Sequence, residues 1–305
     1  MMTADAKSLF SRFTGLFLDV ADPRLYACVR IAFAFVSLLN LMQIWPDREV
    51  FFTAAGMVDH DTVQKYTVGV YWSALDLCSD LSAVSAYLLC SGAAMVLLLL
   101  GVWPRLAAAV VYVWHVSYAM RAPLVLVGWD EVLRCTSFLV LISPMPACWA
   151  LQSRRARKKT AFRPPPLRYG LTLMQAQLVA IYVHAVLARL SDDYWMSGDF
   201  MSFFLLSHNS RWPGLWVLDY GFLLKGVTYL VLLLELAIPV LLLIRRWRWW
   251  GVAAGIFLHA GISLMAYNLE LFFLAMLMLY LSFLQPEDMD RLQSHLPKSR
   301  GMVGK

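Results

Sequence analysis

The chain has 305 residues, of which 60% are hydrophobic and only 15% are charged. A soluble domain is usually about 45–50% apolar and about 25% charged, so this composition indicates a polytopic membrane protein. The net charge of +6 does not predict nucleic-acid binding, because the basic residues lie in short runs between apolar segments and not on one face of a soluble domain. The five cysteines form no CxxC pair, so neither a metal site nor a disulfide framework is predicted.

Residues 1–20 predict a short amphipathic helix on the cytoplasmic surface, since Asp19 interrupts the apolar run and no small-residue cleavage site follows it. A membrane-spanning helix needs about 20 apolar residues. The sequence therefore predicts an all-α transmembrane helix bundle of about eight spans. We expect the spans at Leu25 to Ile44, Leu81 to Val102, Leu106 to Ala122, Glu131 to Cys148, Tyr169 to Leu190, Leu223 to Ile244, Gly251 to Met265 and Leu269 to Leu284. They would form one domain over residues 1–290, followed by a cytoplasmic tail over residues 291–305.

The basic residues predict the orientation of these spans. Most fall on one side of the membrane: Lys7, Arg12, Arg24, Arg105, Arg154, Arg155, Arg157, Lys158, Lys159, Arg163, Arg168, Arg245, Arg246, Arg248, Arg291, Lys298, Arg300 and Lys305. The loops of the opposite side are rich in acidic residues. The positive-inside rule then puts both termini in the cytoplasm of a multi-pass protein of the cell membrane, which is the inner membrane in a Gram-negative cell.

The two long outer loops, Trp45 to Asp80 and Ser191 to Gly221, are rich in aromatic residues. Aromatic side chains favour the headgroup region, so we expect short helices on the outer surface there. The inner loop after the fourth span is basic and broken by prolines, which predicts an irregular segment near anionic lipid.

The fifth expected span carries the largest number of polar side chains. Polar groups in hydrocarbon are costly and tend to face a bundle interior or a wet cavity. We therefore expect this span to be the helix around which the others pack, with a charged mouth at one membrane surface. Its polar and charged residues are Gln175, Gln177, Tyr182, His184, Arg189, Asp192, Asp193 and Trp195.

Two further sites hold ionisable residues at the expected spans. Arg30 lies within the first span, where a long side chain can snorkel toward the cytoplasmic headgroups or serve a function. Asp130 and Arg134 are four residues apart, so they share a helix face and can neutralise each other. That pair predicts either a structural ion pair at an outer helix mouth or the lining of a polar vestibule.

Glu235 and His259 are the most informative pair, because both are expected near the middle of neighbouring antiparallel spans. A lone ionised glutamate at that depth costs several kcal/mol, so Glu235 should be paired or protonated. The pair predicts either a hydrogen bond between packed helices or a proton-relay or substrate-binding role. A metal site formed with His115 and His184 is a further alternative, but no HxxxH or HExxH spacing supports it.

Several stretches in order resemble the HTTM superfamily, the membrane domain of vitamin K-dependent γ-carboxylases. They are ADPRLYACVRIAFA, GWDEVLRCTSFLVLISP, CWALQSRRARKK, QAQLVAIYVHAVLARLSDDYWMSGDF, LLLELAIPVLLLIRRWRWWGVAAGIFLHAGI and FFLAMLMLYLSFL. The resemblance covers nearly the whole chain. It implies that a quinol or other isoprenoid lipid is held inside the bundle, and that a strong base formed from it removes a proton from a peptide glutamate.

This chain departs from the carboxylases at the positions that matter for that chemistry. The activating lysine of the family corresponds to Arg189, which is a permanent cation and cannot serve as a neutral amine base. The catalytic histidine of the carboxylases falls near Trp129 or Asp130. The chain also ends soon after the last span, without the large lumenal domain of those enzymes. We therefore expect no γ-carboxylation of the eukaryotic kind.

The leading hypothesis is a small bacterial-type HTTM protein with an outward-facing intramembrane polar cavity, similar to the membrane subunit that matures a secreted toxin of the sporulation-delaying type. Its partners would be membrane lipids, a secreted peptide and a soluble maturation partner, without nucleic acid. The alternatives are a quinol-dependent oxygenase or carboxylase-like enzyme acting on peptide glutamate, and a structural or immunity-type membrane protein. The candidate catalytic residues are Glu235, His259 and Arg189, and the candidate cofactor-binding residues are Gln177, Tyr182, His184, Trp195, Asp130 and Arg134.

Overall fold

The computed structural model describes residues 13–53, 56–66, 69–78, 80–151 and 164–295. Within these ranges the regular elements are helices, and extended pairing is limited to the isolated bridges Val20–Leu167 and Ser210–Ala266. The all-α prediction is therefore confirmed. The first residues of the expected N-terminal helix, 1–12, and most of the basic loop, 152–163, lie outside the described residues.

Each expected span contains a helix. These helices are α2 (Pro23–Ile44), α5 (Leu81–Leu100), α6 (Pro104–Arg121), α7 (Gly128–Ile142), α9 (Tyr169–Leu190), α12 (Gly221–Leu243), α13 (Arg248–Met265) and α14 (Glu270–Tyr280), which continues as η5 (Leu281–Phe283). The fourth was expected to reach Cys148 but ends at Ile142. The reason is Pro144, because the residue before a proline is driven out of the helical conformation.

Local sequence explains where the other helices begin and end. Asp80 caps α5 by accepting a hydrogen bond from the backbone N–H of Ala83. Gly101 ends that helix with a φ of 68°, a left-handed conformation that glycine adopts without steric cost. Pro104 then stands at the start of α6. Proline has no backbone N–H, and at the first position of a helix that N–H would have no partner within the helix.

Four helical stretches in the described ranges are long and apolar enough to cross a membrane: Pro23–Phe52, Leu81–Leu100, Tyr169–Leu190 and Leu215–Leu243. A fifth is added if Glu270–Phe283 and Pro286–Ser294, which are bent by 106° relative to each other, count as one span. Large apolar side chains also project outward from these helices, for example Phe222 on α12, which is 94% exposed. Such apolar surface is rare on a soluble monomer and is what lipid requires.

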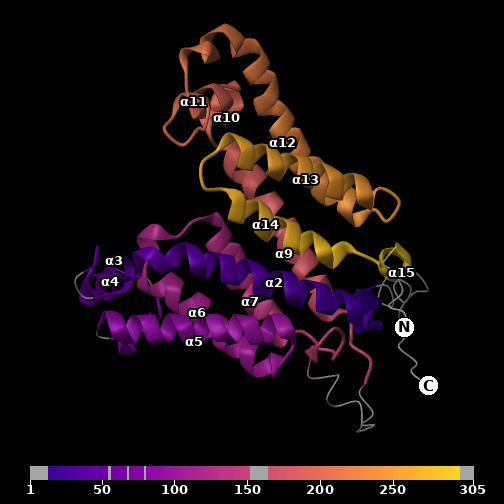
Figure 1. Ribbon diagram of the computed structural model, residues 1–305. Helices are drawn as coiled ribbons and strands as arrows, with labels where there is room; N and C mark the ends of the chain where they lie inside the picture. The colour runs from indigo at the N-terminus through magenta and orange to yellow at the C-terminus, as the bar shows by residue number, and fades with distance from the viewer. Residues whose placement is uncertain (1–12, 54–55, 67–68, 79, 152–163, 296–305) are drawn as a thin grey trace, which may run out of the picture.

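The helices form two groups that α14 joins (Figure 1). In the first group α2 packs on α5, α5 on α6 and α6 on α7; in the second α12 packs on α9 and α13, and α14 contacts both α13 and α2. The α12–α13 turn and α15 (Pro286–His295) lie toward the end of the molecule at which α2 begins, whereas α3 (Arg48–Phe52) and α4 (His60–Tyr66) lie at the opposite end (Figure 1). The basic α12–α13 turn thus shares an end with the start of α2.

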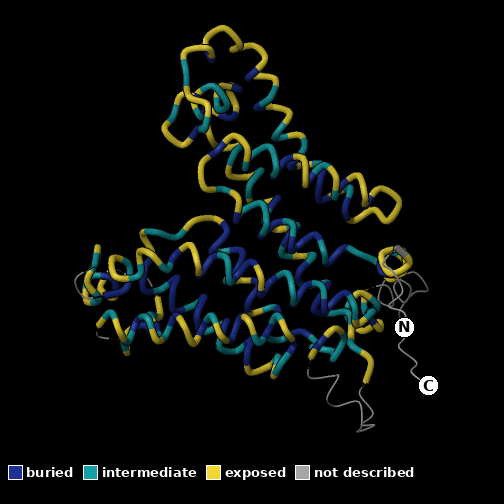
Figure 2. The backbone as a smooth tube through the Cα atoms, in the orientation of Figure 1, coloured by how far each residue is buried: buried dark blue, intermediate teal, exposed yellow. Residues whose placement is uncertain are grey.

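The most buried of the candidate spans is the one that contains α2, and not α9, which the sequence predicted to be the helix around which the others pack. Of the most apolar window of Pro23–Phe52, 61% is buried, compared with 22% for that of Tyr169–Leu190. Figure 2 shows this burial along α2 and exposed positions along α9 and α12. The physical reason is packing: α2 contacts α5, α7, α14 and η5, whereas one side of α9 faces outward.

Short helices occupy both of the long loops in which the sequence predicted them. The first loop contains η1 (Trp45–Asp47), α3, α4 and η2 (Ala74–Leu77). The second contains α10 (Asp193–Ser197), α11 (Phe200–Leu206) and η4 (Leu215–Tyr220), and α10 and α11 pack against the start of α12. A final short helix, η3 (Pro123–Val125), joins α6 to α7.

Arg30 does not snorkel, as one interpretation of the sequence held, but is buried at 5% exposure. Its guanidinium donates to the backbone carbonyls of Leu98, Leu99, Cys148 and Trp149, at 2.9 Å for Leu99 and 3.1 Å for Trp149. The last carbonyls of a helix have no partner within it and carry its negative dipole end. Arg30 therefore ties the end of α5 and the loop after α7 to α2.

Candidate functional site

Arg189 on α9 and Glu235 on α12 form an ion pair. The Glu235 side chain is 4% exposed and that of Arg189 is 24% exposed, so the pair connects the interior to the surface of the helix group. Of the two interpretations of Glu235 and His259, the hydrogen bond between them is wrong, because Glu235 pairs with Arg189 and His259 Nε2 bonds to Tyr182. Arg189 supplies the positive charge that a buried carboxylate requires.

Trp195 holds the other side of Arg189. The guanidinium carbon lies 4.5 Å from the centre of the indole ring, within the range of a cation–π interaction. The indole itself is buried and stacks on Phe200 with ring centres 4.0 Å apart. Asp192 caps α10 through the N–H groups of Tyr194 and Trp195, which fixes the indole position. Arg189 is thus held between a carboxylate and an aromatic face.

His259 on α13 belongs to a neighbouring hydrogen-bonded chain. Its Nε2 lies 2.8 Å from the hydroxyl of Tyr182, which in turn hydrogen-bonds to the hydroxyl of Tyr280 on α14. His259 Nδ1 is buried and has no hydrogen-bond partner among the described residues. An imidazole–hydroxyl–hydroxyl chain of this kind can pass a proton or bind a polar ligand atom. Tyr280 was not among the predicted site residues, because its place at the end of an apolar run gives no sign of a partner.

Gly255 makes room for this chain. A methyl group at its Cα would collide with the hydroxyl of Tyr280, so the glycine is what allows that hydroxyl to reach Tyr182. The close approach of α13 and α14 here follows the use of small residues at contacts between membrane helices.

A second polar cluster lies in the first helix group. Asp130 Oδ1 accepts from Asn40 Nδ2 at 2.8 Å, and Asp130 Oδ2 accepts from the Val127 backbone N–H at 3.0 Å and from the Tyr118 hydroxyl at 3.4 Å. Arg134 instead pairs with Glu131, three residues before it. The predicted Asp130–Arg134 pair is therefore absent from the described structure, because the first turn of α7 directs Asp130 inward to Asn40.

The remaining predicted residues are not brought into either cluster. Gln177 on α9 donates to the Val132 carbonyl and hydrogen-bonds to Thr136, and it lines a groove of about 660 Å³ that also includes Arg134. His184 is exposed. His115 is fully buried and hydrogen-bonds to Ser37 at 3.0 Å. In the part of the chain that the structure describes, no three metal-binding side chains gather in one place.

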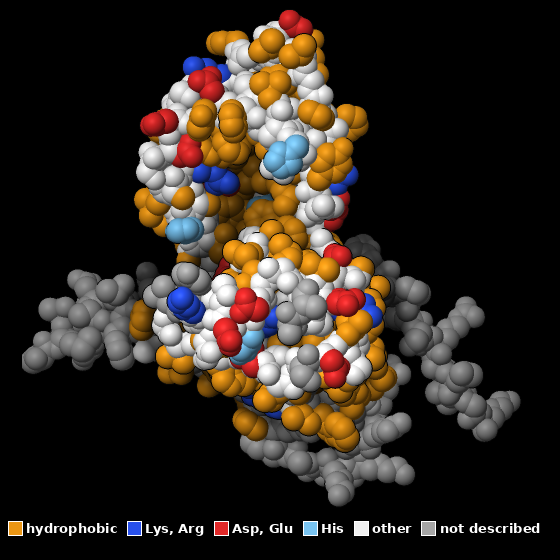
Figure 3. All heavy atoms as spheres, turned by 90° about the vertical axis from the view of Figure 1, so that its left-hand side faces the viewer, with side chains coloured by type: hydrophobic (Ala, Val, Ile, Leu, Met, Phe, Trp, Pro, Cys, Tyr) orange, Lys and Arg blue, Asp and Glu red, His pale blue; other side chains and the backbone are white. Residues whose placement is uncertain are grey.

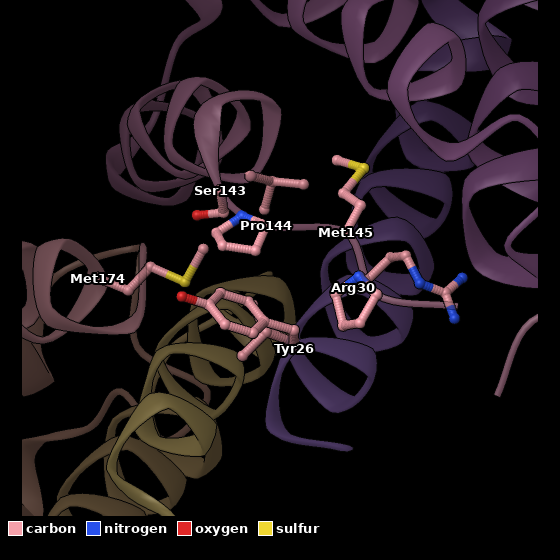
Figure 4. Close-up of a pocket in the computed structure, with 9 residues that line it drawn as sticks. Tyr26, Arg30, Ser143, Pro144, Met145 and Met174 are labelled. Atoms are coloured by element: carbon pink, nitrogen blue, oxygen red, sulfur yellow. The ribbon is translucent and has the colours of Figure 1, made fainter. Parts of the chain in front are cut away.

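Viewed from the end that carries α3 and α4, the molecule is hollowed between the upper part formed by α10–α12 and the lower helix group (Figure 3). The walls of this hollow are largely hydrophobic, and basic side chains stand at its margin (Figure 3). A different, small pocket of about 10 Å³ lies among Tyr26, Ser143 and Met174, and the Arg30 guanidinium points away from it (Figure 4). That pocket holds little more than one water and is too small for a substrate.

A comparison with family models identifies the relatives of this chain. The model described as the HTTM domain matches residues 19–287. The chain belongs to the HTTM family. It is thus an integral, multi-pass membrane protein of that family, in contact with lipid, and the resemblance seen in the sequence is confirmed at this level. No curated protein and no solved structure matches this HTTM chain.

Proposed function

We propose that this HTTM protein handles a secreted peptide, and that Arg189 binds a carboxylate of that peptide within the membrane. The observation that carries the proposal is the setting of Arg189, a permanent cation held between Glu235 and Trp195. The planar guanidinium fork suits a carboxylate, so the role we assign to Arg189 is to bind an anion and not to act as a base. The protein would then lack the γ-carboxylation of the eukaryotic members.

The guanidinium has capacity for a second anion. It carries five N–H donors in a planar fork, and within the described residues it donates one hydrogen bond, to Glu235. An arginine binds a carboxylate best through two parallel hydrogen bonds. The remaining donors, on a side chain 24% exposed, therefore provide a place for a peptide carboxylate beside Glu235.

The proposed orientation gives this site its direction. With about eight spans of about 20 residues each, both termini would lie on one side of the membrane. The positive-inside rule would make that side the cytoplasm and put the end of α9 at the outer surface of the cell membrane. The hollow of Figure 3 then opens outward as the intramembrane cavity, and a soluble partner would reach the peptide from that side. The domain would cover residues 1–290, with residues 291–305 as a cytoplasmic tail.

A second candidate function is a quinol-dependent oxygenase or carboxylase-like enzyme, with a quinone or other isoprenoid lipid as cofactor. The observation that favours it is the chain of Tyr182, His259 and Tyr280, in which the imidazole Nδ1 has no partner among the described residues. A cofactor oxygen could accept a hydrogen bond there. The hydroxyls and the imidazole would bind and orient that oxygen and move a proton within the chain.

Photo-crosslinking separates the two functions. A photoreactive amino acid at Ala185, one turn before Arg189 on the same helix face, should capture a peptide in the native host. The matched control is Leu187, which is 62% exposed on the same helix and should capture phospholipid alone. A quinone captured at position 185 would favour the enzyme. Phospholipid alone at both positions would contradict both functions and favour a structural or immunity-type membrane protein.

A further inference from the structure

Asp130 is a buried carboxylate without a positive partner among the described residues. Asp130 is 3% exposed. The groups that donate hydrogen bonds to its carboxylate are all neutral: Asn40, Tyr118 and the Val127 backbone N–H. A buried ionised carboxylate is costly unless it is paired. Arg134, the nearest cation in sequence on α7, is held by Glu131. The described side chains around Asp130 therefore include no cation that would balance a negative charge on its carboxylate.

Asn40 adds an independent sign of a ligand. It is 1% exposed, and its Oδ1 is buried with no hydrogen-bond partner among the described residues. Its Nδ2 already donates to Asp130, so the free oxygen needs a donor from outside the described side chains. A buried acceptor left without a donor costs about 1–3 kcal/mol. A group that brings N–H donors would satisfy Asn40 and Asp130 together.

A pocket adjoins these two side chains. It has a volume of about 250 Å³ and includes Asn40, Asp130, Tyr118 and Trp129 in its lining. That volume is several times the share of about 30 Å³ that a water molecule occupies in the liquid, so an alkyl chain with a polar head fits. The lining also contains the exposed residues Asp47 and Asn268, which mark the side from which a ligand enters.

The charge and the aromatic content of this pocket define the ligand. Asp47 and Asp130 are its charged lining residues, and no lysine or arginine of the described chain lines it. The rings of Phe51, Tyr118 and Trp129 supply faces that attract a cation. We propose that this pocket binds a primary ammonium group, such as a lysine side chain or the amino terminus of a peptide. This site lies on α2, α6 and α7 and does not depend on the role proposed for Arg189.

A peptide ammonium fits better than the ethanolamine headgroup of a phospholipid. Such a headgroup carries a phosphate close to its ammonium, and a phosphate requires basic or N–H donors. The carboxylates of the lining would repel it. A lysine side chain instead brings an apolar stem that packs against Phe51 and Trp129 while its three N–H donors reach Asp130 and Asn40.

The test uses the full-length protein in lipid nanodiscs and two photoreactive labels that differ in one group. One is a diazirine-bearing hexylamine and the other is the corresponding hexanol. Peptide mapping by mass spectrometry measures how much of each label reaches residues of the pocket lining. We expect the amine to label them at least about tenfold more than the alcohol, since a desolvated charge pair is worth more than a neutral hydrogen bond. Equal labelling by the two compounds would overturn the proposal, and this comparison needs only the native protein.

Variants and competitors locate the binding group. Asp130→Asn keeps the shape of the side chain but removes its charge, and should lower amine labelling to the level of the alcohol. Glu131→Gln is the matched control: it removes one negative charge from the next residue, which is outside the pocket lining, and should leave the labelling unchanged. Equal loss in both variants would contradict a specific site at Asp130. N-acetyl-lysine amide should compete with the label, whereas stronger competition by phosphoethanolamine would overturn the assignment to a peptide.

Discussion

Arg189 and Glu235 lie on different helices and form an ion pair in which the Glu235 side chain is 4% exposed and the Arg189 side chain is 24% exposed. The carboxylate thus has its charge matched in the interior, while the cation remains accessible from outside. An ion pair with one accessible member can exchange partners more readily than a fully enclosed one. This asymmetry is the structural basis for assigning ligand binding to Arg189.

Removal of one member of this pair should destabilise the protein. Breaking a fully buried pair costs about 3–5 kcal/mol, and the partial exposure of Arg189 should bring the loss for Arg189→Gln nearer to about 2 kcal/mol. Glu235→Gln should cost less, because the remaining charge on Arg189 can reach water. The double variant Arg189→Gln/Glu235→Gln should lose less stability than the sum of the two single losses. Denaturant unfolding in detergent measures these values, and strictly additive losses would show that the two side chains are not coupled.

Tyr182→Phe should lower stability by about 1–3 kcal/mol, because it leaves both His259 and Tyr280 without their shared hydroxyl partner. The matched control is Tyr229→Phe, which removes a hydroxyl that donates to the Met196 carbonyl from an exposed side chain. That change should cost well under about 1 kcal/mol. A loss of equal size in the two variants would contradict a buried hydrogen-bonded chain.

Arg30→Met should destabilise the protein by about 3 kcal/mol or more, because it removes a buried guanidinium that serves four backbone carbonyls. Arg30→Lys keeps the charge but lacks the planar fork, so it should recover only part of the loss. The temperature at which the detergent-solubilised protein aggregates ranks the stability of the native protein, Arg30→Lys and Arg30→Met. Full recovery by lysine would show that charge alone is sufficient at this position.

The pH dependence of stability should carry a contribution from Asp22, which caps α2 and pairs with Arg24 at 2.5 Å. Burial acts to raise the pKa of this carboxyl, but the hydrogen bonds and positive charge of Arg24 outweigh it and hold the pKa below its ordinary value. A folded-state pKa below the unfolded one stabilises the protein above the unfolded value, and the gain is lost as the pH falls through the folded value.

The variant Asp22→Asn keeps a capping side chain without the titrating charge. The native protein should therefore be more stable than this variant at neutral pH, and the difference should shrink as the pH drops below the ordinary aspartate value of about 3.9. Acid unfolding followed by circular dichroism measures both curves. A difference that stays constant down to the lowest pH would contradict the charge contribution of Asp22.

The positions of the long helices could be predicted from the sequence because apolar length and turn chemistry are local properties. Pro104, Gly101 and Asp80 stand at helix ends for reasons visible in the chain itself. The central helix was predicted wrongly, since the number of polar residues on α9 does not measure packing. Polar residues in an apolar run indicate a site, but they can equally line the surface of the bundle, as exposed His184 does.

The partners within the site could not be predicted in the same way. Depth along a span places Glu235 and His259 at similar heights, but rotation about each helix axis decides which side chains meet, and the apolar neighbours that set this rotation are interchangeable in sequence. Glu235 thus meets Arg189, and His259 meets Tyr182. Tyr280 and Asn40 were missed because a single tyrosine or asparagine in an apolar helix has no distinguishing spacing.

The most direct test of the proposed function is native mass spectrometry of the protein purified in mild detergent from its host. We expect a bound peptide on the native protein that is absent from Arg189→Gln, while Arg134→Gln, a variant at a cation held by its helical neighbour Glu131, retains it. Recovery of a stoichiometric quinone instead, lost on Tyr182→Phe and kept by Arg189→Gln, would contradict peptide binding by Arg189 and favour the quinol-dependent enzyme.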